Sequence, residues 1–286
     1  MKENIYNLSL EELKSFFIDL NEKPFRADQL WNWIYVKGIN NFENINNMSK
    51  ALIEKISNSF YISKLNISKN YVSKDGTKKW LYLLSDGKEI ETVYIPEKKR
   101  GTICISSQVG CTLSCAFCHT GTMKFIRNLN VSEILGQIIQ VKNELEDWNN
   151  KSDERKVTNI VFMGMGEPFY NYDNVLKTIN VLTDGNGLAF SKRKITLSTS
   201  GVVPKIESFK EDSDVNLAVS LHAAFDDIRN ELVPINKKWP INKLLESLKS
   251  YSMRRKNKRI TFEYIMLDGV NDSIKDAQEL IKLIKP

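Results

Sequence analysis

Three of the four cysteines in this 286-residue chain lie close together, at Cys111, Cys115 and Cys118. Thiolates are soft ligands that favour iron–sulfur clusters, zinc or copper. Three such ligands on a short loop after an expected strand suit a cluster that keeps one metal position open. The Cys-x3-Cys-x2-Cys spacing therefore favours an iron–sulfur centre with an exchangeable position, as a catalytic site requires.

Three other interpretations of these cysteines stay open at the level of sequence. A structural zinc site needs a fourth ligand, for which His119 is poorly placed beside Cys118 and Cys104 has no usual finger spacing. Residues 115–119 also fit the C-x-x-C-H pattern of c-type haem attachment, which normally belongs to exported proteins and leaves Cys111 unexplained. The third interpretation is a set of small buried side chains, because unbridged cysteines are often buried.

Polar residues also follow several expected strands. Gly166 and Glu167 follow one strand, where glycine lets the backbone approach a ligand and a carboxylate can bind an ammonium group. Ser198 ends a second strand. Ser220, Leu221 and His222 end a third. Ligand sites in barrels gather at the carboxyl ends of strands, so these residues are candidates for binding. Turn chemistry, a solvated glutamate and a structural histidine are the simpler alternatives.

Two further residues could take part in chemistry. Glu91 lies in the expected strand 89–95 and, by period two, shares a face with Val93 and Ile95. A carboxylate on such an apolar face is poorly solvated and could act as a base, although an inward charge that guards a sheet edge is an equal alternative. Cys104 lies on a strand seven residues before Cys111. From its position alone, we interpret Cys104 as a small buried residue.

The elements that must position these residues alternate after residue 101. Short β-rich runs alternate with helical stretches, which predicts parallel strands joined by crossover helices, as an open sheet or a barrel. The expected strands are residues 102–106, 157–163, 194–198, 215–220 and 259–266. The expected helices are residues 131–145, 172–182, 205–209 and 241–251.

The first ninety-odd residues have a different pattern. Ser9 and Glu12 form a capping-box pair, and apolar residues at helical spacing predict helices at about residues 10–20, 27–36 and 49–57. Turn signals at residues 75–76 and 86–87 then separate strands such as 79–84 and 89–95. We therefore expect a helical and β-meander domain over residues 1–96 and an α/β core over residues 97–286. Trp31, Trp33 and Tyr35 could stack on bases, although helical spacing favours Trp31 and Tyr35 as core.

Composition limits the possible settings of the protein. A chain that is 42% hydrophobic and 27% charged can bury a core, and its net charge of +6 permits a polyanionic partner. Basic clusters at residues 98–100, 192–194, 237–238 and 254–259 could contact phosphates or simply be solvated. We expect neither a membrane span nor a secretory signal. We therefore expect the protein to lie in the reducing cytoplasm.

Several segments together resemble the RlmN-type adenine-C2 RNA methyltransferases, which belong to the radical S-adenosylmethionine (SAM) superfamily. The matching segments are residues 24–31, 105–118, 163–168, 197–204, 219–223 and 233–238. The resemblance implies a partial (β/α) barrel with a small N-terminal helical and β-meander domain. It also implies a [4Fe-4S] cluster held by Cys111, Cys115 and Cys118, with SAM on the fourth iron.

The resemblance implies roles for the remaining candidates as well. Gly166 and Glu167 would hold the amino group of SAM. Contacts to the rest of SAM would come from Ser198, Ser220, Leu221 and His222. Glu91 would take the C2 proton of adenine, and Cys104 would release the product by forming a disulfide with a methyl-carrying cysteine.

The expected function is methylation of adenine C2 in 23S ribosomal RNA and transfer RNA, by a cytoplasmic monomer that an external electron donor reduces. One alternative is a relative that methylates C8 of adenine. Another is a non-catalytic fragment that binds cluster, SAM and RNA. The family's last barrel strand, a SAM-contacting asparagine and the methyl-carrying cysteine are expected beyond residue 286, and no cysteine follows Cys118.

Overall fold

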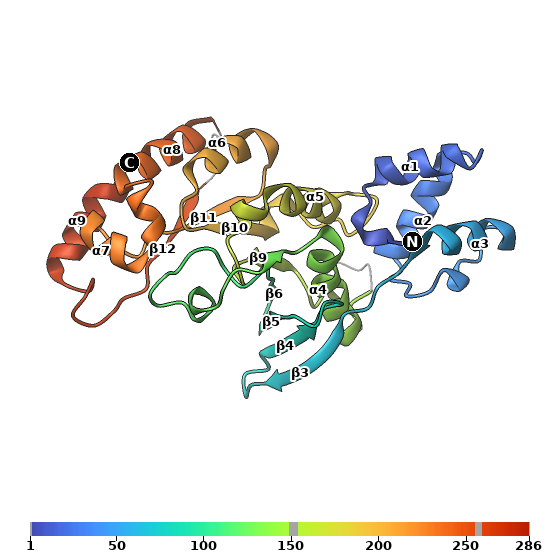
Figure 1. The fold of residues 1–286 in the computed structure, drawn as a ribbon, viewed down its shortest axis with the longest axis horizontal. Coiled ribbons are helices and arrows are strands. Elements are labelled where there is room, and N and C mark those ends of the chain that lie inside the picture. The colour runs from blue at the N-terminus through green and yellow to red at the C-terminus, as the bar shows by residue number, and fades with distance from the viewer. Residues whose placement is uncertain (1, 149–153, 255–258, 286) are drawn as a thin grey trace. The chain divides into compact units, whose positions relative to one another are not determined.

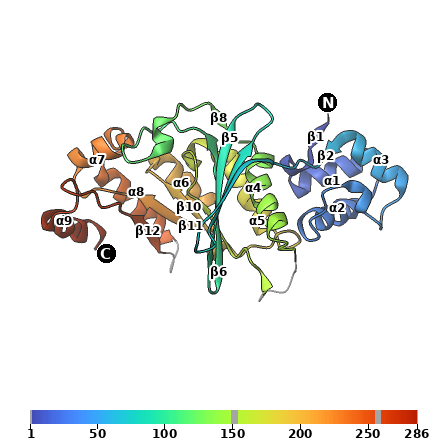
Figure 2. The ribbon, with the colours of Figure 1, turned by 90° about the horizontal axis from the view of Figure 1, so that it is seen from below.

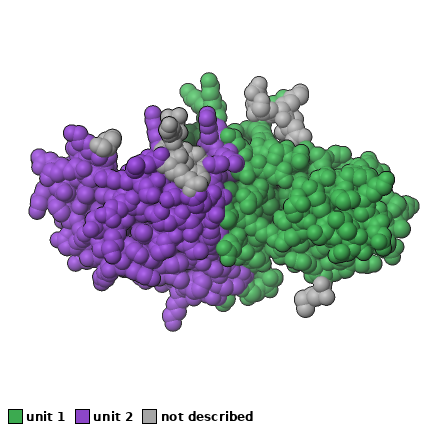
Figure 3. Space-filling view, turned by 90° about the horizontal axis from the view of Figure 1, so that it is seen from above, with its two compact units in different colours: residues 1–105, 129–160, 173–191 green, residues 106–128, 161–172, 192–286 purple. Residues whose placement is uncertain are grey.

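The computed structural model describes residues 2–148, 154–254 and 259–285. The chain divides into two compact units, which Figure 3 shows in green and purple. Unit 1 comprises residues 1–105, 129–160 and 173–191, and unit 2 comprises residues 106–128, 161–172 and 192–286. Within the described residues, no helix combines the length and the apolar character that a membrane span requires.

The helices at the start of unit 1 are α1 (Leu10–Asp19), α2 (Phe25–Tyr35) and α3 (Lys50–Ser59), shown in blue in Figure 1. Helix α1 begins at the predicted capping box, in which the Glu12 amide donates to Ser9 Oγ and the Ser9 amide donates to Glu12 Oε2. Helix α2 begins two residues earlier than expected, directly after Pro24, because the fixed φ of proline suits a helix start.

The three aromatic residues of α2 belong to the core of unit 1. Trp31, Trp33 and Tyr35 are all buried, and the Trp33 indole donates to Asn47 Oδ1 at 2.7 Å. Because a base can stack only on an exposed ring, the structure does not support the base-stacking interpretation of these residues.

Unit 1 also contains the predicted antiparallel meander. Strands β3 (Asn66–Val72), β4 (Lys78–Leu83), β5 (Glu89–Glu97) and β6 (Arg100–Cys104) pair in that order. Strand β3 precedes the two strands named from sequence, and the expected core strand 102–106 follows them as β6. Gly76 and Gly87 form the first two turns with positive φ, which glycine adopts without strain. Helices α4 (Val131–Glu144) and most of α5 (Tyr172–Thr183) complete this unit.

Strand β9 (Asn159–Phe162) begins in unit 1 and ends in unit 2. It corresponds to the expected strand 157–163, shortened at both ends. The Thr158 amide just before it donates to the carbonyl of Gly101 in β6.

Unit 2 has the parallel strands that the alternating pattern predicts. Strands β10 (Ile195–Thr199), β11 (Asn216–Ser220) and β12 (Ile260–Glu263) pair side by side (Figure 2). The connecting helices are α6 (Val203–Asp212), α7 (Asp226–Leu232) and α8 (Ile241–Arg254), and α9 (Ile274–Ile284) follows β12. The βα alternation is therefore confirmed. Parallel register brings the carboxyl ends of three strands to one edge.

Candidate active site

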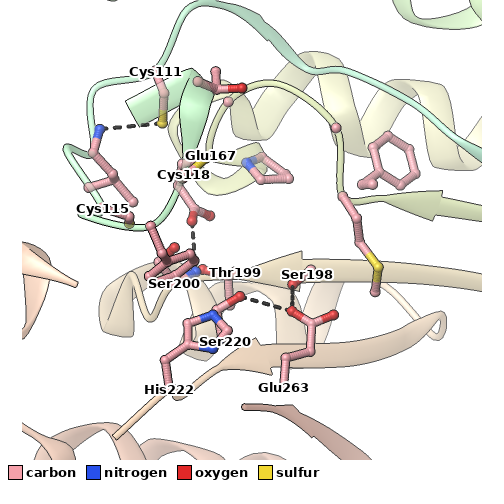
Figure 4. A pocket seen from close by; sticks show the side chains of 18 of the residues that line it. Cys111, Cys115, Cys118, Glu167, Ser198, Thr199, Ser200, Ser220, His222 and Glu263 are labelled. Atoms are coloured by element: carbon pink, nitrogen blue, oxygen red, sulfur yellow. Dashed lines mark hydrogen bonds between the residues drawn. The ribbon is translucent and has the colours of Figure 1, made fainter. Parts of the chain in front are cut away.

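A pocket of about 470 Å³ lies at this edge, and all of its lining residues belong to unit 2 (Figure 4). It brings together eight of the predicted site residues, namely Cys111, Cys115, Cys118, Gly166, Glu167, Ser198, Ser220 and His222. Leu221 lies between two of them in the chain and is fully buried. The lining extends from Cys111 to Ile265, so segments far apart in sequence meet at one site.

The cysteines lie on a loop between the short paired strands β7 (Gln108–Val109) and β8 (Arg127–Asn128). Because the loop contains little regular structure, individual contacts fix its path. The Ala116 amide donates to the Leu232 carbonyl at 3.0 Å, and the Cys118 amide donates to the Cys115 carbonyl at 3.1 Å. Gly110 has φ +75°, and a Cβ there would lie 2.0 Å from the Lys124 carbonyl oxygen. This position therefore requires glycine.

Two of the thiols, those of Cys111 and Cys115, are poorly suited to ionise without a bound metal. Burial raises the pKa of Cys111, and burial followed by the neighbouring Cys111, Cys118 and Glu167 raises the pKa of Cys115 to about 12. A metal that binds here must displace thiol protons, as soft cations do. None of the four cysteines is disulfide-bonded.

The three thiols that line the pocket are a donor set that an iron–sulfur cluster takes. In such a cluster each thiolate binds a different iron. Within residues 2–148, 154–254 and 259–285, no group of three or more His, Cys, Asp or Glu side chains could hold one metal ion.

Glu167 is held rigidly at the pocket wall. It is 3% exposed, its Oε2 accepts from the Ser200 amide at 2.8 Å and its Oε1 accepts from the Phe169 amide at 3.1 Å. Burial raises the pKa of this carboxyl above its ordinary value. The preceding Gly166 has φ +98°, and a Cβ there would lie 2.4 Å from Gln108. The backbone can therefore follow this path only with glycine.

His222 is a neutral imidazole in the folded chain. Burial and the nearby Arg229 lower its pKa to about 4. Its Nδ1 accepts from the Ile265 amide at 3.1 Å, so the ring proton lies on Nε2. Phe117 packs edge-on against the ring, with the two centroids 4.5 Å apart. His222 therefore presents a donor, not a charge.

Glu263 is a pocket residue that the sequence interpretation missed. It ends β12, and its Oε2 accepts from Ser198 Oγ and from Ser220 Oγ, each at 2.9 Å. The only available signal was a carboxylate inside the expected strand 259–266, and its position at the strand end became clear only because that strand is shorter than expected.

Arg229 was missed as well. It is 0% exposed and lies on α7, a helix that the sequence interpretation did not include. Its guanidinium donates to the carbonyls of Ser200, Ser220 and Leu221 and to Asn236 Oδ1, at 2.8 to 3.0 Å. Burial lowers its pKa to about 10, so it remains a cation at neutral pH. Arg229 therefore fixes the loops that follow β10 and β11.

The expected environment of Glu91 is wrong. Its carboxylate forms an ion pair with Lys79 at 2.7 Å, and the two side chains are 41% and 42% exposed. The buried face of β5 carries Ile90, Thr92 and Tyr94 instead. The edge-guarding alternative is wrong too, because β5 pairs with β4 on one side and β6 on the other.

Cys104 is half-buried at the end of β6, opposite Val93. Cys104 and Glu91 both belong to unit 1, whereas the pocket belongs to unit 2. Their catalytic roles stay predictions.

The basic clusters lie largely on the surface. Residues 98–100 and 192–194 are exposed, with Arg100 paired to Glu97 and Lys192 paired to Asp214. Residues 255–258 of the last cluster lie outside the described residues.

Family models match two parts of the chain. Residues 3–62 match the ribosomal RNA large subunit methyltransferase N-terminal domain, and residues 105–284 match the radical SAM superfamily. A radical SAM methyltransferase from Sphaerobacter thermophilus has a similar structure, with a TM-score of 0.91 and 36% identity, covering 99% of this chain and 82% of that one.

Curated relatives match over nearly all of this chain. A dual-specificity RNA methyltransferase RlmN from Rhodospirillum rubrum is 50% identical over 99% of this chain and 66% of its own length. One of the same name from Parvibaculum lavamentivorans is 51% identical over 97% of this chain and 72% of its own length. The chain thus spans about two thirds of the length of these relatives.

These matches confirm the predicted radical SAM fold class and identify the cofactors of the family as a [4Fe-4S] cluster and SAM. The triad at 111–118 and the strand-end residues of unit 2 lie inside the matched range 105–284. The chain belongs to the radical SAM superfamily and, within it, to the RlmN family.

Proposed function

We propose that this chain acts as a SAM-dependent methyltransferase that modifies C2 of adenine in 23S ribosomal RNA and in transfer RNA. The observation that carries the proposal is the single pocket that joins the cysteine triad to Glu167, Ser198, Ser220 and His222. The relatives' description as dual-specificity RNA methyltransferases supports the reaction class and the RNA substrates.

Within this pocket, Cys111, Cys115 and Cys118 would hold three irons of the cluster. Gly166 and Glu167 would bind the amino group of SAM, since the buried carboxylate already stands at the pocket wall. The remaining contacts to SAM would come from Ser198, Ser220, Leu221 and His222. The bound cluster and SAM supply the radical chemistry that methylation of an electron-poor carbon requires.

The remaining two catalytic candidates would act on the RNA base. Glu91 would take the C2 proton. Cys104 would release the product by forming a disulfide with a methyl-carrying cysteine, which is expected outside residues 1–286. The half exposure of Glu91 would let a substrate reach its carboxylate. The Lys79 ammonium would leave the Glu91 carboxylate when the adenine approaches for proton transfer.

Ribosomal and transfer RNA as substrates would place the enzyme in the cytoplasm, with an external reductant for the cluster and a monomeric chain. Residues 1–96 would form an accessory RNA-binding domain and residues 97–286 the radical SAM core.

The cluster assignment is tested by anaerobic reconstitution of the chain with iron and sulfide. We expect about four irons per chain and broad visible absorbance. Cys111→Ala, Cys115→Ala and Cys118→Ala should each lose most of the iron, whereas the matched control Cys104→Ala should keep it. Equal iron content in all four variants would refute the assignment.

The reaction is tested by expressing the protein from its gene in a bacterium that lacks adenine-C2 methylation. Mass spectrometry of digested ribosomal and transfer RNA should detect 2-methyladenosine. Detection of 8-methyladenosine alone would favour the C8-methylating alternative. SAM binding and iron loading without any RNA methylation would favour the binding function.

A further inference from the structure

Glu263 joins three neighbouring parallel strands at the edge where the pocket lies. It stands opposite Ser220 in the register of β11 and β12, and Ser198 comes from β10 on the other side of β11. Both serine hydroxyls bond to the same oxygen, Oε2, at 2.9 Å (Figure 4). The carboxylate makes no other side-chain hydrogen bond within the described residues, so Oε1 remains available to a ligand.

This arrangement fixes the hydrogen-bonding polarity of the pocket. A serine hydroxyl has one proton to donate, and a carboxylate can only accept. A hydroxyl that donates to Oε2 has only lone pairs left for a ligand. Ser198, Ser220 and Oε1 of Glu263 therefore form a cluster of acceptors.

A cluster of acceptors selects a ligand with adjacent donors and repels an anionic group. The SAM molecule carries two neighbouring donors on its ribose, and its carboxylate would be repelled here. Its ammonium group has a separate partner in Glu167, which is held by the amides of Ser200 and Phe169. The polarity of this part of the pocket thus matches the ribose.

We propose that Glu263 is a specificity-determining residue of the SAM site. Its carboxylate accepts a hydrogen bond from a ribose hydroxyl and makes Ser198 and Ser220 acceptors as well. This inference rests on the proposed function, because it assigns a role within the same SAM pocket.

The test is SAM binding by the cluster-loaded chain, measured by equilibrium dialysis without turnover. The probes are SAM and its 2′-deoxy and 3′-deoxy analogues. A hydrogen bond to a charged group contributes about 1.5–3 kcal/mol. The wild-type chain should therefore bind at least one analogue about tenfold or more weakly than SAM.

The variants are Glu263→Gln, which keeps the shape of the side chain and adds donors, and Glu263→Ala. Both variants should bind SAM about tenfold more weakly than the wild type. In both, the dissociation constant of the deoxy analogue should exceed that of SAM by only about twofold or less. The control Glu246→Gln removes the same charge from the exposed surface of α8 and should change neither value. Iron content and visible absorbance confirm that each variant holds its cluster.

The ratio separates specificity from mere support of the fold. If Glu263 only holds the serines in place, its variants bind all three probes more weakly by the same factor, and the inference is wrong. It is equally wrong if both variants bind like the wild type. If the wild-type chain binds no SAM at all, the proposed function fails and the inference fails with it.

Discussion

His222 shows how one residue can be fixed by its surroundings. Its backbone φ of +58° lies in the left-handed region, which costs a residue with a Cβ roughly 1–2 kcal/mol. The Asn271 side-chain amide donates to its carbonyl at 2.7 Å, and its ring accepts from the Ile265 amide. These bonds stabilise a conformation that the residue would otherwise avoid.

The neutral state of His222 predicts a pH dependence of stability. Its pKa falls from 6.5 to about 4 on folding, so between these values the unfolded chain binds a proton that the folded chain does not. The free energy of unfolding should therefore fall as the pH is lowered from 6.5 towards 4. At pH 5, His222 should lower the free energy of unfolding by up to about 2 kcal/mol relative to its value at neutral pH.

Urea unfolding of the metal-free chain at pH 7 and pH 5 measures this effect. His222→Gln should lose that part of the pH dependence, whereas His119→Gln, at an exposed position, should keep it. The same pH dependence in the wild type and in His222→Gln would count against the neutral, buried imidazole.

At the scale of elements, α7 is connected to the strands by Arg229. The planar guanidinium reaches three backbone carbonyls and one amide oxygen at once, which the single ammonium of lysine cannot do in the same geometry. Arg229→Lys should therefore lower the free energy of unfolding by about 2–4 kcal/mol, because buried acceptors lose their donors.

Urea titration followed by circular dichroism measures the loss. Arg193→Lys makes the same exchange at an exposed position and should stay within about 0.5 kcal/mol of the wild type. If the two variants were equally stable, the bonds of Arg229 would contribute nothing net.

Sequence predicted the elements where the signal is local. The Ser9 capping box, the glycine turns and the alternating strands and helices all depend on neighbours a few residues apart. Strand β5 shows where this fails. Both of its faces carry apolar side chains, Ile90 and Tyr94 on one and Val93 and Ile95 on the other, so period two cannot tell which face is buried. Which face of β5 is buried depends on how the strand packs in three dimensions.

In the candidate site, too, the residues that sequence could predict are those that belong to a local pattern. The cysteine triad could be recognised because its spacing is compact, and the glycine at 166 precedes a glutamate in a short motif. Glu263 meets its partners across 65 and 43 residues, and Arg229 meets Ser200 across 29. Single charged residues with such distant partners leave no local pattern, so only the structure reveals them.

At the scale of the whole molecule, the net charge of +6 predicts salt-sensitive RNA binding. Displacement of counterions makes affinity fall with salt in proportion to the phosphates contacted. Transfer RNA should bind about tenfold or more weakly in 200 mM than in 50 mM potassium chloride, as measured by fluorescence anisotropy.

Exposed lysines between β5 and β6 provide a more specific test. Replacement of Lys98 and Lys99 by glutamate should weaken binding and flatten the salt dependence. Replacement of the exposed Lys243 and Lys249 of α8 by glutamate makes the same change of charge outside residues 1–96 and serves as the matched control. Affinity that is insensitive to salt in the wild type would exclude a major phosphate contribution.

The bonds of Arg229 also bear on attempts to redesign the pocket. The loops after β10 and β11 look like separate modules that could be grafted one at a time from a relative. Yet the arginine donates to the Ser200 carbonyl after β10 and to the Leu221 carbonyl after β11, and Asn236 in turn bonds to Arg229 and Asp226. A graft that moves one loop without residues 226–236 would leave a buried cation facing misplaced acceptors. The two loops and α7 should therefore be transferred together.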